Sequence, residues 1–182
     1  MNNDNILVIH PKDVTTDVLS VIYNDINATV LRQPTSKKRL KELIKAADRV
    51  IMLGHGTEYG LLSLVNHNPY AFIDSSLVYL LREKKDNIYI WCHADVFVKK
   101  YGLSGFSTGM FISETDEADY YNVKATAEEI WYSNNNFSRI VSENVHKKGS
   151  DILKALKANY KSAHSEVIIY NSERLYNFTK PL

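Results

Sequence analysis

Cysteine is almost absent from this sequence: Cys92 is the only one in 182 residues, so no disulfide can form within the chain. A lone free thiol is typical of a reducing compartment, and we expect the protein to be cytoplasmic. An excess of one charge is also missing, because 22 Lys and Arg against 21 Asp and Glu leave a net charge of +1. This balance argues against nucleic acid as a partner and against a polybasic membrane-binding surface.

Long apolar runs are missing as well, and none approaches the roughly 20 residues that a membrane-spanning helix needs. The polar start of the chain is unlike a signal peptide. The four prolines and seven glycines form no linker, and no glycine-rich loop has the spacing of a phosphate-binding motif. We therefore expect one domain over residues 1–182, with 45% hydrophobic residues to build its core and with no cofactor.

Short apolar runs alternate with segments of helical spacing along the whole chain. The expected strands are 6–9, 28–32, 50–53, 88–91, 110–112 and 167–170. The expected helices are 14–26, 36–47, 74–81, 96–101, 125–132, 137–145 and 150–162. Residues 60–69 favour a hairpin, 102–109 a loop, and the asparagines at 134–136 a helix break. This order predicts an α/β fold: a three-layer sandwich with a mostly parallel central sheet.

Two of the expected strands end on residues that can carry chemistry. The run 50–53 leads into Gly54-His55-Gly56, and the run 88–91 leads into Cys92. One helix separates the two runs, so we expect their strands to be parallel neighbours in the sheet. Ligands of open α/β sheets bind beyond the carboxyl ends of the strands, and both residues would face that crevice.

A thiol and an imidazole at one crevice favour nucleophilic catalysis. The imidazole of His55 would act as the base and lower the pKa of Cys92 below the usual value of about 8.5. The backbone N–H groups of Gly56 and Cys92 could together bind an oxyanion, since no side chain of Gly56 obstructs the approach. The alternative is a buried, inert Cys92 and a His55 that only shapes a turn.

Other histidines receive different interpretations. His10 ends the first expected strand and could border the same crevice as a substrate-binding residue. His93 follows Cys92 and should point to the opposite face of the strand, where it would be structural. Adjacent ligands at 92 and 93 would diverge, and the spacing matches no structural zinc pattern, so we expect no metal site.

The strand-end motifs resemble those of the caspase-like cysteine peptidases, a superfamily that includes metacaspases, paracaspases, separase, gingipains and CHAT domains. Leu53-Gly-His-Gly56 is similar to the family's histidine motif, and Trp91-Cys-His-Ala94 is similar to the Cys-His-Ser form of metacaspases. The segment Ile112-Ser-Glu-Thr-Asp-Glu-Ala118 resembles the polar segment that helps to line the S1 pocket. The resemblance follows the order of elements over residues 6–170.

The resemblance implies a cysteine endopeptidase in which His55 is the general base and Cys92 the nucleophile, acting on a polypeptide substrate. Asp116 or Glu117 would then line S1 and favour Lys or Arg at P1, the substrate residue before the cleaved bond. The alternative is an inactive caspase-like module that holds a peptide or small ligand in the crevice. The bulky Trp91 and the lack of a single evident S1 acid favour this alternative.

Overall fold

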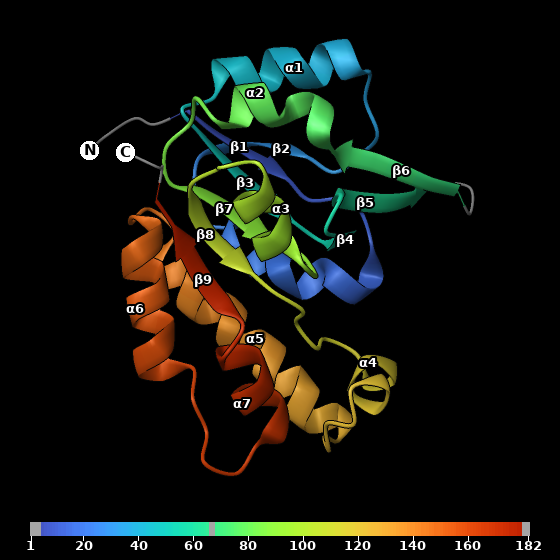
Figure 1. Cartoon of the computed structure of the whole chain (residues 1–182), viewed down its shortest axis with the longest axis vertical. Helices are drawn as coiled ribbons and strands as arrows, with labels where there is room; N and C mark the ends of the chain where they lie inside the picture. The colour runs from blue at the N-terminus through green and yellow to red at the C-terminus, as the bar shows by residue number, and fades with distance from the viewer. Residues whose placement is uncertain (1–4, 66–67, 180–182) are drawn as a thin grey trace.

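A six-stranded sheet forms the centre of the computed structural model, which describes residues 5–65 and 68–179 (Figure 1). The strands lie in the order β2-β1-β3-β7-β8-β9. Their bounds are β1 (Ile6–Ile9), β2 (Ala28–Leu31), β3 (Arg49–Leu53), β7 (Asn87–Ile90), β8 (Gly105–Thr108) and β9 (Leu175–Phe178). The first five strands are mutually parallel, and β9 runs antiparallel to β8. The fold is therefore α/β with a mixed, mostly parallel sheet.

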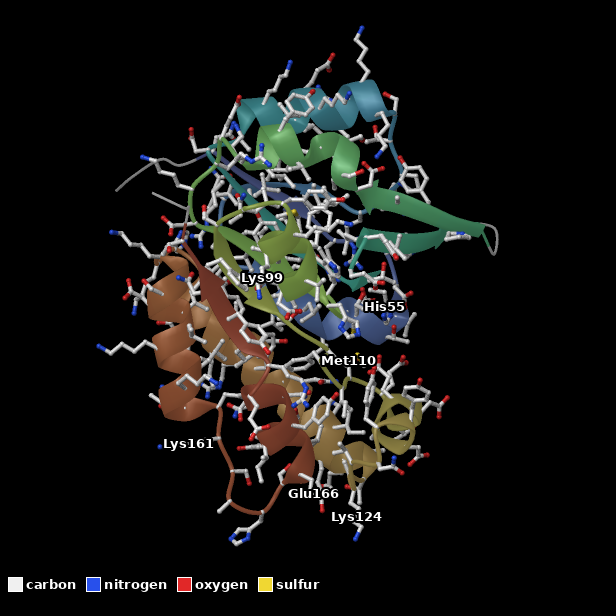
Figure 2. The ribbon with its side chains drawn as sticks, viewed as in Figure 1. His55, Lys99, Met110, Lys124, Lys161 and Glu166 are labelled. Atoms are coloured by element: carbon white, nitrogen blue, oxygen red, sulfur yellow. The ribbon has the colours of Figure 1, made fainter. Side chains whose placement is uncertain are left out.

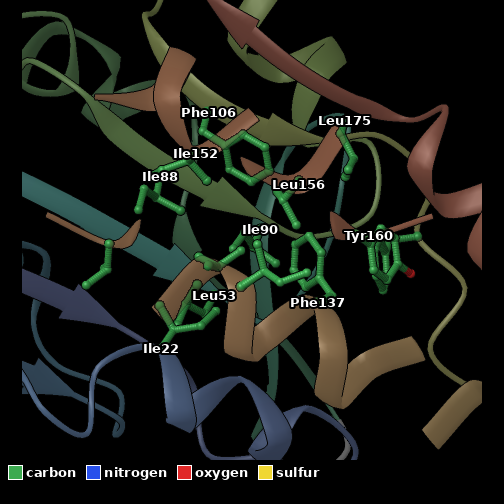
Figure 3. Packing of buried hydrophobic residues seen from close by; sticks show 14 of the residues in the cluster. Ile22, Leu53, Ile88, Ile90, Phe106, Phe137, Ile152, Leu156, Tyr160 and Leu175 are labelled. Atoms are coloured by element: carbon green, nitrogen blue, oxygen red, sulfur yellow. The ribbon is translucent and has the colours of Figure 1, made fainter. Parts of the chain in front are cut away.

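Helices cover both faces of this sheet. Their bounds are η1 (Val14–Ile22), α1 (Lys37–Ala46), η2 (Ser75–Leu77), α2 (Val78–Leu81), α3 (Ala94–Lys100), α4 (Thr115–Tyr120), α5 (Ala127–Asn144), α6 (Gly149–Asn159) and α7 (Glu166–Ser172). One hydrophobic core lies under η1, α5, α6 and α7 (Figure 3), and the other lies under α1, α2 and α3. Among the described residues, no helix is long and apolar enough to cross a membrane.

The strands with continuous apolar sequence are buried on both faces. In β3, Ile51 and Leu53 pack into the core shown in Figure 3, whereas Val50 and Met52 pack into the opposite core. Successive side chains of a strand point to opposite faces, so a strand between two helical layers needs apolar residues at every position. The prediction that the strands 50–53 and 88–91 are parallel neighbours is confirmed by the pairing of β3 with β7, and β1 lies parallel on the other side of β3.

A second, smaller sheet projects between β3 and α2 (Figure 1). It contains β4 (His55–Thr57), β5 (Gly60–Val65) and β6 (Asn68–Ile73), paired antiparallel in sequence order. The expected hairpin is thus present, although residues 66–67, between β5 and β6 in the sequence, lie outside the described residues. This sheet starts at His55, so the histidine is held by a strand and not by a free loop.

Two predictions around the last parallel strand were wrong. Residues 102–109 were expected to form a loop but contain β8, and residues 110–112 were expected to form a strand but have no regular structure. Gly105 explains the first error: a Cβ at this position would lie 2.0 Å from the carbonyl oxygen of Asn87. The glycine permits close pairing of β8 with β7, whereas a sequence pattern assigns glycine to a loop.

Three further predictions were wrong in the helices. The asparagines at 134–136 do not break α5, which is continuous, and residues 167–170 form part of α7 instead of a closing strand. The expected helix 14–26 is a 3-10 helix that ends at Ile22. An apolar run of four residues is compatible with a buried strand or a buried helix turn, so the run at 167–170 could not decide between them.

Candidate functional site

The carboxyl ends of β3 and β7 bring His55 and Cys92 to the same edge of the sheet. In the parallel pairing of these strands, Leu53 lies opposite Ile90, and Gly54 N–H donates to Ile90 O at 3.0 Å. His55 and Cys92 each follow two residues after the last strand residue. Gly54 has a φ of +139°, a conformation that favours glycine at the sharp bend between β3 and β4.

Both side chains line one narrow pocket between η1, the ends of β3 and β7, the segment 108–113 and α5. Its volume is about 40 Å³, and the lining residues include Thr15, Phe111, Ser113 and Asn134. A water molecule needs roughly 10–15 Å³ of cavity volume, so the pocket has room for about three water-sized groups. A long substrate side chain requires the pocket to widen.

A hydrogen bond holds His55 to the first turn of η1. The Nε2 atom of His55 lies 2.6 Å from Thr15 Oγ1 and 3.9 Å from Asp13 Oδ2. The Thr15 hydroxyl also lies 2.8 Å from Asp13 Oδ1 and donates its proton to it. Figure 2 shows His55 beside η1, in agreement with these contacts. Asp13, Thr15 and His55 therefore form a chain of hydrogen bonds at the pocket wall.

This chain assigns the proton on His55. Thr15 has one hydroxyl proton, which it gives to Asp13, so Thr15 Oγ1 must accept from His55 Nε2–H. In the neutral imidazole, Nδ1 then carries the free lone pair that a general base needs. Burial alone would raise the pKa of Asp13, but the two hydrogen bonds from Thr15 and the nearby His55 bring this pKa below its usual value. Asp13 is therefore an anion at neutral pH.

Cys92 is partly exposed, and its thiol is protonated in this conformation. Burial raises the pKa of Cys92 to about 11, and the carboxylates of Glu117 and Glu114 also raise it. The thiol donates to Phe111 O at 3.7 Å, and no hydrogen bond joins its Sγ to His55, although both residues are described. The expectation of a lowered thiol pKa is therefore wrong for this conformation, because burial dominates and the imidazole is directed to Thr15.

The two proposed oxyanion donors differ in their surroundings. The N–H of Cys92 has no hydrogen-bond partner among the described residues. Gly56 lies in β4 and does not line the pocket, and a Cβ there would lie 2.2 Å from Trp91 Cδ1. The missing side chain of Gly56 thus makes room for the indole of Trp91, whereas we expected it to make room for substrate.

Trp91 links the histidine segment to the cysteine segment. Its side chain is buried, and its Nε1 donates to the carbonyl oxygen of Thr57 at 3.0 Å, two residues after His55. The ring also makes edge contacts with Tyr89 and Phe97 in the adjacent core. The bulky residue before Cys92 therefore fixes β4, and with it His55, against the end of β7.

The remaining candidate residues do not line the pocket. His10 is fully buried, with Nδ1 2.9 Å from the Tyr23 hydroxyl and Nε2 3.3 Å from the Thr16 hydroxyl. Asp116 is exposed on α4. Glu117 is the capping-box residue of α4, and its Oε2 accepts from Ser113 N, Ser113 Oγ and Glu114 N. His93 follows the end of β7 with a φ of +65°, so strand alternation does not determine its direction.

Sequence reasoning did not find Asp13, Thr15 or Asn134. A signal for the first two exists: Asp13 caps η1 directly after β1, and β1 is a parallel neighbour of β3. A polar cap after β1 must lie at the same sheet edge as His55. Asn134 had no such signal, because its approach to the pocket depends on how α5 crosses the sheet.

Alkylation of Cys92 provides a test of its protonation state. Because the thiol pKa is raised to about 11, we expect the rate of modification by iodoacetamide to be low at pH 7 and to rise about tenfold per pH unit up to pH 10. Mass spectrometry of the native protein against time measures this rate. A rate that reaches its plateau below pH 8 would show that the thiolate is stabilised, in contradiction to this environment.

No known protein-family model matches the sequence, and no curated protein is significantly similar to it. Among the described residues, no three His, Cys, Asp or Glu side chains are grouped as a metal site would require.

Proposed function

We propose that the protein is a caspase-like cysteine endopeptidase in which Cys92 is the nucleophile and His55 the general base. The observation that carries this proposal is the placement of both residues after adjacent parallel strands, in one pocket. Nucleophilic catalysis needs a thiol and a base at one substrate site, and the hydrogen-bond chain from Asp13 leaves His55 Nδ1 free to act as that base.

The reaction would proceed through an acyl-enzyme. His55 Nδ1 accepts the thiol proton, and Cys92 Sγ attacks the carbonyl carbon of the substrate peptide bond. The oxyanion accepts a hydrogen bond from the unpaired N–H of Cys92. The imidazolium then gives its proton to the departing amine nitrogen as the C–N bond breaks. Water, deprotonated by His55, then attacks the thioester carbon and restores the thiol.

The observed conformation corresponds to a resting state. The thiol donates to Phe111 O, and the pocket of about 40 Å³ is too narrow for a peptide. Movement of Phe111 away from Cys92 would free the thiol from Phe111 O and enlarge the pocket. Once Cys92 is paired with His55, imidazolium would stabilise the thiolate and lower the pKa of the thiol.

A second candidate function is binding without turnover, and the raised pKa of Cys92 favours it. A protonated thiol without a hydrogen bond to an imidazole is chemically inert. In this case the pocket would hold a peptide or a small ligand on a caspase-like scaffold. The raised pKa of Cys92, however, depends on the narrow conformation of the pocket. The placement of His55 and Cys92 at the strand ends is determined by the fold itself, so we favour the peptidase.

Labelling with peptidyl acyloxymethyl ketones tests the peptidase proposal, because these probes alkylate a cysteine that is activated by a bound peptide. We expect a mass increase of one probe on wild-type protein, none on Cys92→Ala, and labelling slowed at least about 100-fold on His55→Ala. His164→Ala, at an exposed loop position, is the control and should label at the wild-type rate. Equal labelling of the wild type and His55→Ala would favour the binding module.

A further inference from the structure

Asn134 brings a buried acceptor without a partner to the pocket of His55 and Cys92. It lies on α5, is 9% exposed and lines the pocket. Its Nδ2 donates to Ser113 O at 3.0 Å, which orients the amide, but its Oδ1 is buried and has no hydrogen bond. A buried acceptor without a partner costs about 1–3 kcal/mol. Native proteins retain such groups mainly where a ligand, an ordered water or strain accounts for them.

The other polar groups of the pocket also have free acceptor capacity. Ser113 Oγ donates to Glu117 Oε2 at 3.1 Å, and Thr108 Oγ1 donates to Trp91 O at 2.9 Å, so the lone pairs of both hydroxyls remain available. The rest of the wall is largely apolar, with side chains such as Leu19, Phe111 and Phe137. A complementary group is therefore small, donates hydrogen bonds and carries no charge.

We propose that Asn134 determines the P1 specificity of this pocket by accepting a hydrogen bond from the side-chain carboxamide of Gln or Asn. This inference rests on the proposed peptidase function and assigns its substrate class. The carboxamide is compact, with three heavy atoms, and therefore suits the narrow pocket. Its NH₂ group supplies two donors, one for Asn134 Oδ1 and one for Ser113 Oγ.

Charged P1 side chains fit these residues less well. An ammonium group would be attracted by the charges of Glu114 and Glu117, but it would leave water without a carboxylate to pair with, because Glu117 Oε2 already accepts three hydrogen bonds and Asp116 is exposed. A carboxylate would face acceptor atoms and the charges of Glu114 and Glu117, which already raise the pKa of Cys92. The expected preference for Lys or Arg is thus not supported by the residues that line the pocket.

Peptides that differ only at P1 test the proposal: Gln, Asn, Glu, Asp, Lys and Met. We expect kcat/KM for Gln or Asn to exceed the values for Glu, Asp and Lys at least about 100-fold. Gln or Asn, whichever the wild type prefers, should have a higher kcat/KM than Met. Asn134→Leu should reduce this ratio of kcat/KM values about tenfold, which is the effect of one lost hydrogen bond. Asn135→Leu is the matched control on the same helix: Asn135 does not line the pocket, and its Nδ2 bonds to Trp131 O. It should keep the wild-type preference.

Asn134→Asp provides a second variant that retains an acceptor at the same position. It should shift the preference from the amides towards Lys, because a buried carboxylate pairs with an ammonium group. A wild-type enzyme that prefers Lys, or one that cleaves all P1 residues alike, would overturn the role of Asn134 and leave the peptidase proposal intact.

Binding to Cys92→Ala separates this inference from the proposed function. Fluorescence anisotropy with the same peptides should show at least tenfold tighter binding of Gln or Asn than of Met at P1, and Asn134→Leu should remove the difference. Such binding without any cleavage by the wild type would refute the peptidase and support the amide site. Neither cleavage nor P1-dependent binding would refute both.

Discussion

Replacement of Cys92 or His55 by alanine is expected to lower kcat/KM for peptide cleavage at least about 10³-fold. The double variant should lose little more than either single variant, because the two residues act in one step. Both line the same pocket after adjacent strands, and the imidazole is the base in that pocket that can take the thiol proton. Steady-state kinetics of the three variants on one substrate measure the coupling.

The hydrogen-bond chain to Asp13 supplies a matched extension of this experiment. Thr15→Val keeps the shape of the side chain but removes the acceptor of His55 Nε2–H, and should lower kcat about 10-fold to 100-fold. Thr29→Val, on the exposed side of the edge strand β2, is the control and should leave kcat unchanged. Additive losses for Cys92→Ala and His55→Ala, or full activity of Thr15→Val, would contradict the assigned base and its tautomer.

The sequence was informative about the sheet because burial on both faces leaves a simple pattern. Four consecutive apolar residues in β1, Val50–Leu53 within β3, and the run 88–91, of which β7 contains the first three residues, indicated central parallel strands, and the structure confirms their adjacency. Adjacency of β3 and β7 then placed His55 and Cys92 at one edge. This part of the site follows from local patterns and from the rule that parallel strands end at the same edge.

The properties that decide the chemistry depend instead on contacts between distant residues. The pKa of Cys92 is raised by burial beneath the segment that contains Phe111, nineteen positions later in the chain. The hydrogen bond of His55 reaches Thr15, forty positions earlier, and Asn134 reaches the pocket only because α5 continues through three asparagines. Asparagine alone favours a helix break, but the Nδ2 bond of Asn134 to Ser113 stabilises the helical position through tertiary contact.

Acidification should destabilise the protein through His10, which lies behind the site and has no exposed surface. Burial, together with the charge of Arg32, lowers the pKa of His10 from 6.5 to about 4. Above pH 6.5 the histidine is neutral in the folded and the unfolded chain, so its contribution to stability is complete. Between pH 6.5 and 4 the unfolded chain binds a proton that the folded chain does not, and the free energy of unfolding should fall by about 3 kcal/mol.

Urea unfolding at half-unit pH intervals measures this loss. His10→Gln should flatten the profile, whereas the exposed control His164→Gln should keep the wild-type slope, and an equally steep profile for His10→Gln would exclude His10 as its source.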